Sequence, residues 1–192
     1  MLAPFMGKFL AGRPKTKVNL KFTNDIIDPM RDDVDLAIQI TEPMAPYLVR
    51  TKLVSANLKL YAEAQIANAI LRVSDLKNHP AIKTSNEDGD EIVLRLNDKD
   101  HSWEERLRVI CTVNDPEAAC FIAAEGQAIA ALPEFLADRF VRMGSLMPVL
   151  PSVHAGVITI SAASPPGRLE VPLMRAFIKA LKKELTDIRF AK

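Results

Sequence analysis

Cysteine, histidine and glycine are scarce in this sequence. Among its 192 residues there are two cysteines, three histidines and seven glycines. We expect Cys111 and Cys120 to be buried, unreactive thiols, because so few cysteines suit a reducing compartment without a disulfide framework. His79, His101 and His154 have no short ligand spacing, so the sequence predicts no metal site.

Recognised catalytic motifs are absent as well. There is no Gly-x-Ser-x-Gly elbow, no Walker phosphate loop and no dinucleotide-binding glycine fingerprint. The acidic pairs at 32–33, 87–88 and 104–105 fall in polar stretches, where solvated carboxylates are the usual outcome. We therefore predict that the chain is not an enzyme and that it carries no cofactor.

Long apolar runs and a strong net charge are missing too. No run approaches the ~20 apolar residues that are needed to span a bilayer, and residues 1–15 lack the pattern of a signal peptide. A net charge of +1 argues against nucleic-acid binding by this chain alone, because such binding relies on clustered Lys and Arg. We expect a cytoplasmic protein without membrane contact.

Residues 113–150 carry the clearest pattern, which predicts a strand, a helix, a buried strand, a second helix and a third strand. Asn114 is placed to cap the first helix, with Glu117 completing a capping box. Gly126 is expected to end that helix with a positive φ. The N–H groups and positive dipole end of such a helix form an anion site where they open onto a cleft.

The N-terminal part of the chain also shows periodic patterns. Residues 18–22 alternate apolar and polar side chains, which predicts a strand. Asn24-Asp25 is placed to cap a short helix through Met30, and residues 34–40 predict the next strand, so a parallel crossover is favoured. Further elements predicted by periodicity are helices at 4–11 and 171–186 and strands at 47–54, 57–61 and 157–162.

These patterns resemble the effector-binding domain of LysR-type transcriptional regulators, bacterial proteins that couple a small-molecule sensor to a winged helix-turn-helix. The family's second glycine after the first helix of this stretch is replaced by Ala128, so the backbone approaches its neighbours less closely there. The matching residues are Asn114-Asp115, Ala118-Ala119, Gly126 with Ile129, Leu132-Pro133-Glu134, Leu136, Gly144 with Leu146, and Pro148-Val149-Leu150, with further landmarks at 17–28, 33–38 and 165–178.

The resemblance implies an α/β fold of two Rossmann-like lobes with a central cleft, similar to type 2 periplasmic binding proteins. Lobe I would comprise residues 1–61 and 163–192, and lobe II residues 62–162. Family domains begin with a strand before the first helix. This sequence starts inside or just before that helix, so we expect the first strand and the DNA-binding region to be missing from it.

The expected effector site lies at the carboxyl ends of parallel strands, where ligands bind in open α/β sheets. Thr23, Asn24 and Asn114 are also good helix caps whatever the function, and that alternative stays open. The effector is expected to be a small organic molecule, with a carboxylate as the first candidate, although nearby acidic residues favour a cationic or zwitterionic compound. The candidate effector-binding residues are Thr23, Asn24, Thr41, Glu42, Asn114, Asp115, Ala128 and Pro133.

The resemblance also implies partners. We expect a homodimer or homotetramer whose DNA contact lies entirely in the absent N-terminal domain, with effector binding between the lobes altering oligomer geometry and transcription. The candidate dimer-interface residues, for which intrachain core is the open alternative, are Phe5, Phe9, Leu10, Val18 and Leu20. A solute-binding protein of the same fold that serves transport is the alternative function, and a small enzyme on the same scaffold is the third.

Overall fold

The longest strand is β2 (Val49–Ala62), and β8 (Gly156–Ser164) is its neighbour in the sheet. The structure, a computed structural model, describes residues 2–23, 25–40, 45–85 and 87–190. Contacts divide the chain into two compact units, which we call unit 1 (residues 1–55 and 159–192) and unit 2 (residues 56–158). The sequence interpretation divides the chain at residues 61 and 163 instead.

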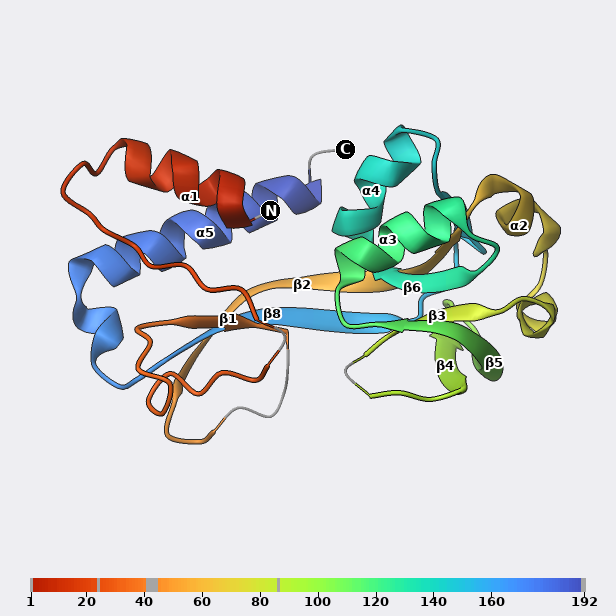
Figure 1. The fold of residues 1–192 in the computed structure, drawn as a ribbon, viewed down its shortest axis with the longest axis horizontal. Coiled ribbons are helices and arrows are strands. Elements are labelled where there is room, and N and C mark those ends of the chain that lie inside the picture. The colour runs from red at the N-terminus through yellow and green to blue at the C-terminus, as the bar shows by residue number, and fades with distance from the viewer. Residues whose placement is uncertain (1, 24, 41–44, 86, 191–192) are drawn as a thin grey trace. The chain divides into compact units, whose positions relative to one another are not determined.

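Unit 1 joins two helices to a short antiparallel strand pair. The helices are α1 (Leu2–Ala11) and α5 (Pro172–Phe190), and the strand β1 (Ala37–Gln39) pairs with β8, while η2 (Arg168–Glu170) leads into α5. Figure 1 shows α1 lying alongside α5. The contact is aromatic, because the ring of Phe177 lies 5.4 Å from that of Phe5 and 5.1 Å from that of Phe9.

Two predicted elements of unit 1 are wrong. Residues 18–22 do not form a strand, because the described part of the chain gives them no hydrogen-bonded neighbour, and an alternating pattern alone leaves backbone groups unpaired. Residues 25–30 form bends and turns instead of a helix, since Pro29 cannot continue a helix and restricts the residue before it. The predicted parallel crossover is therefore not formed by the described residues.

Unit 2 is built on a mixed sheet in the order β2-β6-β3-β5-β4, with β7 also pairing with β2. β6 pairs parallel with β3, which pairs parallel with β5, and β5 continues into an antiparallel hairpin with β4. β2 is one continuous strand where the sequence predicts two. The remaining strands are β3 (Ala81–Thr84), β4 (Glu91–Asn97), β5 (Ser102–Val113), β6 (Ile129–Pro133) and β7 (Met147–Val149).

Each face of this sheet has its own core. Ala81 and Ile129 face one core, with α2 (Ala64–Ala69) and η1 (Val73–Asn78). Their neighbours in sequence, Ile82 and Ala130, face the other core, with α3 (Pro116–Glu125) and α4 (Glu134–Arg142), as the two-residue period of a strand requires. Figure 1 shows α3 and α4 covering β6 and β3. The central strands β3 and β6 are thus packed against a core on both faces.

Small side chains let α3 lie close against the sheet. Ala119, Cys120 and Ala123 are fully buried in the contact. Burial raises the pKa of the Cys120 thiol to about 11, so this cysteine stays protonated and unreactive at neutral pH, as the sequence predicts. Cys111 is only partly buried, so the prediction of a buried thiol is confirmed for Cys120 alone. No helix in the described part of the chain is both long and apolar enough to cross a membrane.

Candidate ligand-binding site

In unit 2 the carboxyl ends of two parallel strands meet at one edge of the sheet. Thr84, the last residue of β3, lies opposite Val113, the last residue of β5. The next residue, Ser85, donates its backbone N–H to the carbonyl of Val113 at 3.0 Å. Asn114 and Asp115 follow directly, so these polar side chains gather where α/β proteins bind ligands. We call Thr84, Ser85, Asn114 and Asp115 the unit 2 edge.

Thr84 carries the most unusual group of the unit 2 edge. Its hydroxyl oxygen is buried and has no hydrogen-bond partner among the described residues. Buried polar groups are paired in the great majority of cases, because an unmet hydroxyl loses its hydration without compensation. An unpaired hydroxyl at a strand end therefore suits a ligand contact. The sequence analysis missed Thr84, because the four-residue strand before it carries too short a pattern to recognise.

Asp115, and not Asn114, caps α3. Its Oδ1 accepts the backbone N–H of Glu117 at 2.9 Å, and its carbonyl accepts the N–H of Ala119 at 3.0 Å. Pro116 occupies the first turn of the helix, so the residue immediately before it takes the cap position. The prediction of Asn114 as the cap is therefore wrong. Asn114 is exposed and makes no hydrogen bond with the described residues through its side chain, which leaves its amide available.

Gly126 ends α3 for a different reason from the one predicted. Its φ is −113°, so the expected positive φ is wrong. A Cβ at this position would lie 2.7 Å from the carbonyl oxygen of Ile122, closer than atoms can approach. Glycine is needed here to make room for the end of the helix. Two other candidates, Ala128 and Pro133, are buried in unit 2, Ala128 with 1% of its surface exposed, so their contact with a ligand stays a prediction.

The unit 1 candidates lie partly outside the described residues, which do not include Asn24, Thr41 or Glu42. Thr23 is exposed, and its hydroxyl donates to Oδ2 of Asp25 at 2.9 Å while accepting the backbone N–H of Asp25 at 3.1 Å. Thr23 thus holds a local turn and does not cap a helix.

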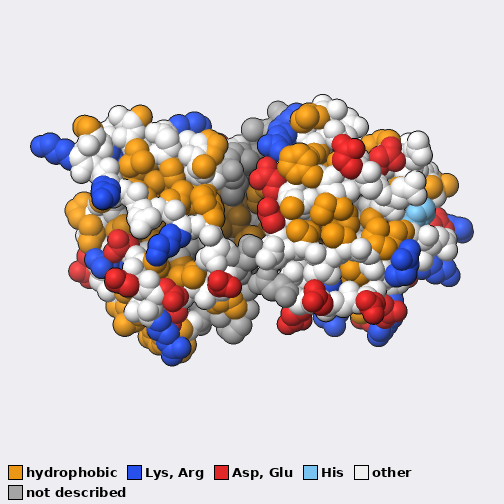
Figure 2. All heavy atoms as spheres, in the orientation of Figure 1, with side chains coloured by type: hydrophobic (Ala, Val, Ile, Leu, Met, Phe, Trp, Pro, Cys, Tyr) orange, Lys and Arg blue, Asp and Glu red, His pale blue; other side chains and the backbone are white. Residues whose placement is uncertain are grey.

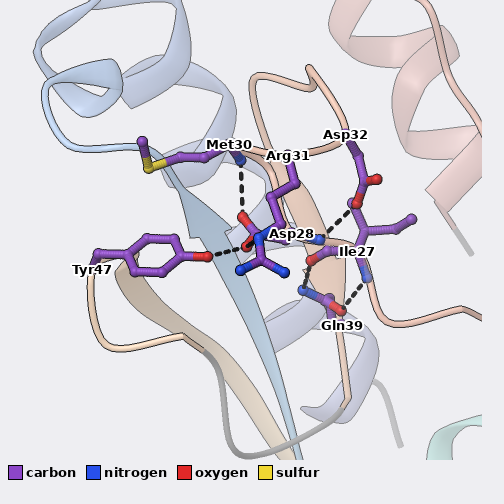
Figure 3. Close-up of polar contacts among 7 residues, drawn as sticks. All are labelled: Ile27, Asp28, Met30, Arg31, Asp32, Gln39 and Tyr47. Carbon is purple, nitrogen blue, oxygen red and sulfur yellow. Dashed lines mark hydrogen bonds and ion pairs between the residues drawn. The ribbon is translucent and has the colours of Figure 1, made fainter.

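Asp28 forms the centre of a polar network in unit 1 that the sequence analysis did not predict. Figure 3 shows the Tyr47 hydroxyl donating to the Asp28 carboxylate, which also accepts the backbone N–H of Met30 at 3.0 Å. The guanidinium of Arg31 lies 3.5 Å from the same carboxylate. The hydrogen bond from Tyr47 is the main reason that the pKa of Asp28 is lowered and that the pKa of Tyr47 is raised.

Gln39 ties this network to strand β1. Its amide nitrogen donates to the carbonyl of Ile27 at 2.8 Å, and its amide oxygen accepts the N–H of Ile27 at 3.2 Å (Figure 3). The side chain therefore satisfies both backbone groups of one residue, as a neighbouring strand would. Side-chain contacts and backbone turns hold the segment 27–32, which overlaps the helix predicted through Met30.

The predicted interface residues divide into two groups. Phe5 and Phe9 are buried in the aromatic contact between α1 and α5, which is the intrachain alternative, and Leu10 is partly buried. Val18 and Leu20 are exposed over 41% and 38% of their surface, and Phe22 over 73%. Val18, Leu20 and Phe22, which we call the 18–22 row, form an apolar surface of unit 1.

No metal centre is indicated at either set of residues. The described residues contain no group of three or more His, Cys, Asp or Glu side chains that could hold a metal ion. The chemistry available at the unit 2 edge is hydrogen bonding by hydroxyl and amide groups, next to the carboxylate of Asp115. Such groups are suited to hydrogen bonding with a small molecule.

Comparison with known proteins gives a family and a fold. The family described as LysR substrate binding domain matches residues 1–186. A curated relative, an HTH-type transcriptional regulator from Xanthomonas campestris pv. campestris (strain 8004), is 24% identical over 190 residues. That match covers 96% of this chain and 55% of the relative, so the chain spans about half the length of the curated relative.

Solved structures share the fold at low sequence identity. The regulatory domain of CrgA from Neisseria meningitidis superposes with a TM-score of 0.80 at 19% identity, over 96% of this chain and 92% of that chain. Full-length AphB from Vibrio cholerae gives 0.78 at 18% identity, over 96% of this chain and 63% of that chain. These regulatory domains have the type 2 periplasmic-binding-protein fold, which confirms the predicted α/β fold class.

Proposed function

Because the chain belongs to the LysR substrate-binding domain family, we propose that it is the effector-sensing part of a bacterial transcriptional regulator. The family match over residues 1–186 is the observation that carries this proposal. The relative described as an HTH-type transcriptional regulator supports it. DNA contact would belong to a winged helix-turn-helix outside this sequence, and the regulator would work in the cytoplasm, where its DNA is.

We propose binding without catalysis as the activity of this chain. The unit 2 edge offers the hydroxyl of Thr84 and the amide of Asn114 to a small organic effector. An effector carboxylate would rely on these groups, because Pro116 has no N–H and Asp115 already accepts the N–H of Glu117. A compound that also carries an ammonium group would find the carboxylate of Asp115 alongside. Carboxylates and amino acids are therefore the compound classes to test first.

Calorimetry of the purified chain against carboxylic acids, amino acids and sugar acids tests this proposal. Thr84→Val should weaken binding of the effector by at least about tenfold, because it removes a buried hydrogen bond to the ligand. The same change should leave stability unchanged or raise it, since the hydroxyl is unpaired in the chain alone. Lost binding with retained stability would separate a ligand contact from a folding defect.

Two further variants complete that experiment. Asn114→Ala should also weaken binding, because its exposed amide has no other partner in the described chain. Thr112→Val is the matched control, since Thr112 precedes Val113 on β5 and lies on the opposite face from Thr84. Equal affinities for the three variants and the unaltered chain, or no binding by any compound class, would contradict a site at the unit 2 edge.

We further propose that the regulator acts as a homodimer or homotetramer whose geometry the effector alters. The exposed 18–22 row on unit 1 and the exposed Phe121 on α3 of unit 2 are apolar surfaces suited to a second copy. Figure 2 shows hydrophobic side chains gathered over α3. Light scattering should report an oligomer, and Leu20→Asp should dissociate it while Val157→Asp, at an exposed site on β8, should not. A monomer at all concentrations would contradict the interface.

A further inference from the structure

Unit 2 contains a pocket open to solvent, which we call the cavity, that the proposed effector site does not use. Its volume is ≈ 410 Å³, within the range of small-molecule sites. The walls come from the chain at 71–74, the start of β5 and the turn at 150–153. Glu105, in this wall, lies eight residues before Val113, the last residue of the same strand, which is about 26 Å at ~3.3 Å per residue. The cavity is therefore a separate site.

Glu105 is a charged residue on the face of β5 that otherwise packs toward the core. Trp103 and Leu107 share its face of β5, and Leu107 is buried in the core. Glu105 is itself partly buried, yet its carboxylate makes no ion pair or hydrogen bond within the described residues. The acidic neighbour Glu104, on the opposite and exposed face, has Arg95 at 3.6 Å. The carboxylate of Glu105 therefore lines the cavity without a partner from the described residues, and it is available to a cation carried by a ligand.

The cavity also has apolar lining residues, beside the polar Ser74 and Ser152. Trp103 lies between the core and the cavity, with its indole stacked on the ring of His101 at 5.6 Å. Leu71, at the rim, exposes 78% of its surface, which is unusual for a leucine beside a cavity. These groups offer one aromatic face and one exposed aliphatic side chain to the apolar part of a ligand.

The backbone is strained at Leu150, which lies in another wall of the cavity. Leu150 has a φ of +48°, a conformation that a leucine rarely adopts, and a proline follows it, which disfavours helical conformations further. The turn is closed by the N–H of Val153, which donates to the carbonyl of Leu150 at 2.8 Å. Strained residues of this kind persist at ligand sites more often than elsewhere. The strain places Leu150 in the wall of the cavity.

Arg72 supplies the positive charge at the rim. Asp75 accepts the backbone N–H groups of Leu71 and Arg72 with one carboxylate oxygen, at 3.1 Å and 2.9 Å. Its other oxygen lies 3.6 Å from the Arg72 guanidinium, whose side chain is 80% exposed. Asp75 therefore fixes the rim mainly through the backbone, and the guanidinium remains accessible to an anionic group of a ligand.

We propose that this cavity binds a small ligand with an ammonium group on an apolar body, either an amine or a free amino acid. The ammonium pairs with Glu105, the apolar body contacts Trp103 and Leu150, and a carboxylate, where the ligand has one, pairs with Arg72. This second site goes beyond the effector-sensing function and does not depend on the unit 2 edge.

Trp103 is the one tryptophan of the sequence, so its fluorescence reports on this cavity. The purified chain should be titrated with phenethylamine, L-phenylalanine and 3-phenylpropionate, which share a phenyl body and differ in charge. We expect a saturable change in Trp103 emission with the first two compounds and none with the third, which has no ammonium group for Glu105. Calorimetry of the same titrations detects any binding that leaves the emission unchanged.

Matched variants locate the binding. Glu105→Gln should weaken both ammonium ligands by at least about tenfold, the usual effect of losing a charge-assisted contact. Glu104→Gln, the same change one residue away on the exposed face, should stay within about twofold. Arg72→Gln should weaken L-phenylalanine and leave phenethylamine unchanged. Thermal unfolding should show that all three variants remain folded.

Three results would overturn the proposal. One is the absence of saturable binding by both fluorescence and calorimetry. Another is equal weakening by Glu104→Gln and Glu105→Gln, which would show a general effect of charge. The third is binding of 3-phenylpropionate as tight as that of the two ammonium compounds. Because none of the variants touches Thr84 or Asn114, these results leave the test of the effector site independent.

Discussion

Two segments of the chain begin with the same sequence signal and end in different structures. Asn24-Asp25 in unit 1 and Asn114-Asp115 in unit 2 each follow an apolar, strand-like stretch, and each predicts a helix start. In unit 2 a helix of ten residues begins at Pro116. In unit 1 the chain from Asp25 to Pro29 makes bends and turns. A capping residue therefore permits a helix and does not by itself cause one.

The residues after the cap decide the difference. In α3 the proline stands in the first turn, where its missing N–H costs nothing, and small side chains then pack fully buried against the sheet. In unit 1 Pro29 stands a few residues after the expected start, where a helix would need its N–H. Ile26 is 69% exposed and Met30 56%, and Pro29 is the fully buried side chain of this segment, so the segment lacks the continuous apolar face that stabilises α3.

Phe140→Ala tests whether the helices of unit 2 depend on packing. Phe140, on α4, is buried and its ring lies edge-on to that of Phe121 at 4.9 Å. Its removal should lower the free energy of unfolding by about 3–5 kcal/mol, because it leaves a cavity in a close-packed core. Ile26→Ala, the counterpart in unit 1, should change it by no more than about 0.5 kcal/mol. Urea unfolding measures both, and similar losses would contradict the contrast.

Gln39→Ala tests whether the turn of unit 1 depends on polar contacts instead. The variant removes both hydrogen bonds to the backbone of Ile27, which should cost about 1–2 kcal/mol in unfolding free energy. Gln127→Ala, at an exposed position without a hydrogen bond in the described structure, should stay within about 0.5 kcal/mol. If the two glutamine variants unfold alike, then the network around Asp28 does not hold the segment.

Unit 2 was the more predictable region, because the apolar residues of its helices and strands recur with a recognisable period in the sequence. The four elements from α3 to β7 match the predicted helix, strand, helix and strand of residues 113–150. What could not be predicted is which strand ends meet. Thr84 becomes part of a site only through the parallel pairing of β3 with β5, whose residues lie 29 positions apart at Thr84 and Val113 (113 − 84).

Unit 1 was less predictable, because its turns are held by side-chain hydrogen bonds between residues that follow no periodic pattern in the sequence. Gln39 bonds to a residue 12 positions away, and Tyr47 to one 19 positions away. Neither pair produces a local pattern in the sequence. Each contact depends on the path of the backbone between the two residues. The cavity beside Glu105 was not predicted, because its lining residues lie far apart in the sequence. The sequence analysis assigned Glu105 to a solvated acidic pair.

Asp115→Ala and Asp25→Ala compare the two helix-start signals directly. Asp115→Ala removes the acceptor for the Glu117 N–H and should lower the unfolding free energy by about 1 kcal/mol, the usual worth of a helix cap. Asp25→Ala removes only a contact with Thr23 in a turn and should change it by less than about 0.5 kcal/mol. Loss of helical circular dichroism should accompany the first variant alone, and an equal loss in both would mean that a helix start forms at Asp25 in solution.

Tyr47→Phe tests whether the stability that the Asp28 contact gives to unit 1 depends on pH. The pKa of Asp28 is lowered from 3.8, chiefly by the hydrogen bond from Tyr47. A carboxyl whose pKa is lower in the folded state contributes stability above its unfolded pKa, and this stability is lost as pH falls through the folded pKa. The pKa of Tyr47 is raised from 10.0 by the same contact, so its contribution is present below that value and is lost as pH rises through the folded pKa.

The unaltered chain should therefore exceed Tyr47→Phe in stability by a constant amount between these limits, and the difference should shrink on both sides. Urea midpoints for the two chains across this pH range measure it. In an Asp28→Asn background the difference should no longer change on the acid side, because the titrating partner has been removed. A difference that does not change as pH passes below 3.8 in the unaltered background would show that Tyr47 contributes by packing and not through the charge of Asp28. The turn of unit 1 thus includes a contact that depends on the charge of Asp28, whereas the helix start of unit 2 gains its stability from a cap and a buried face.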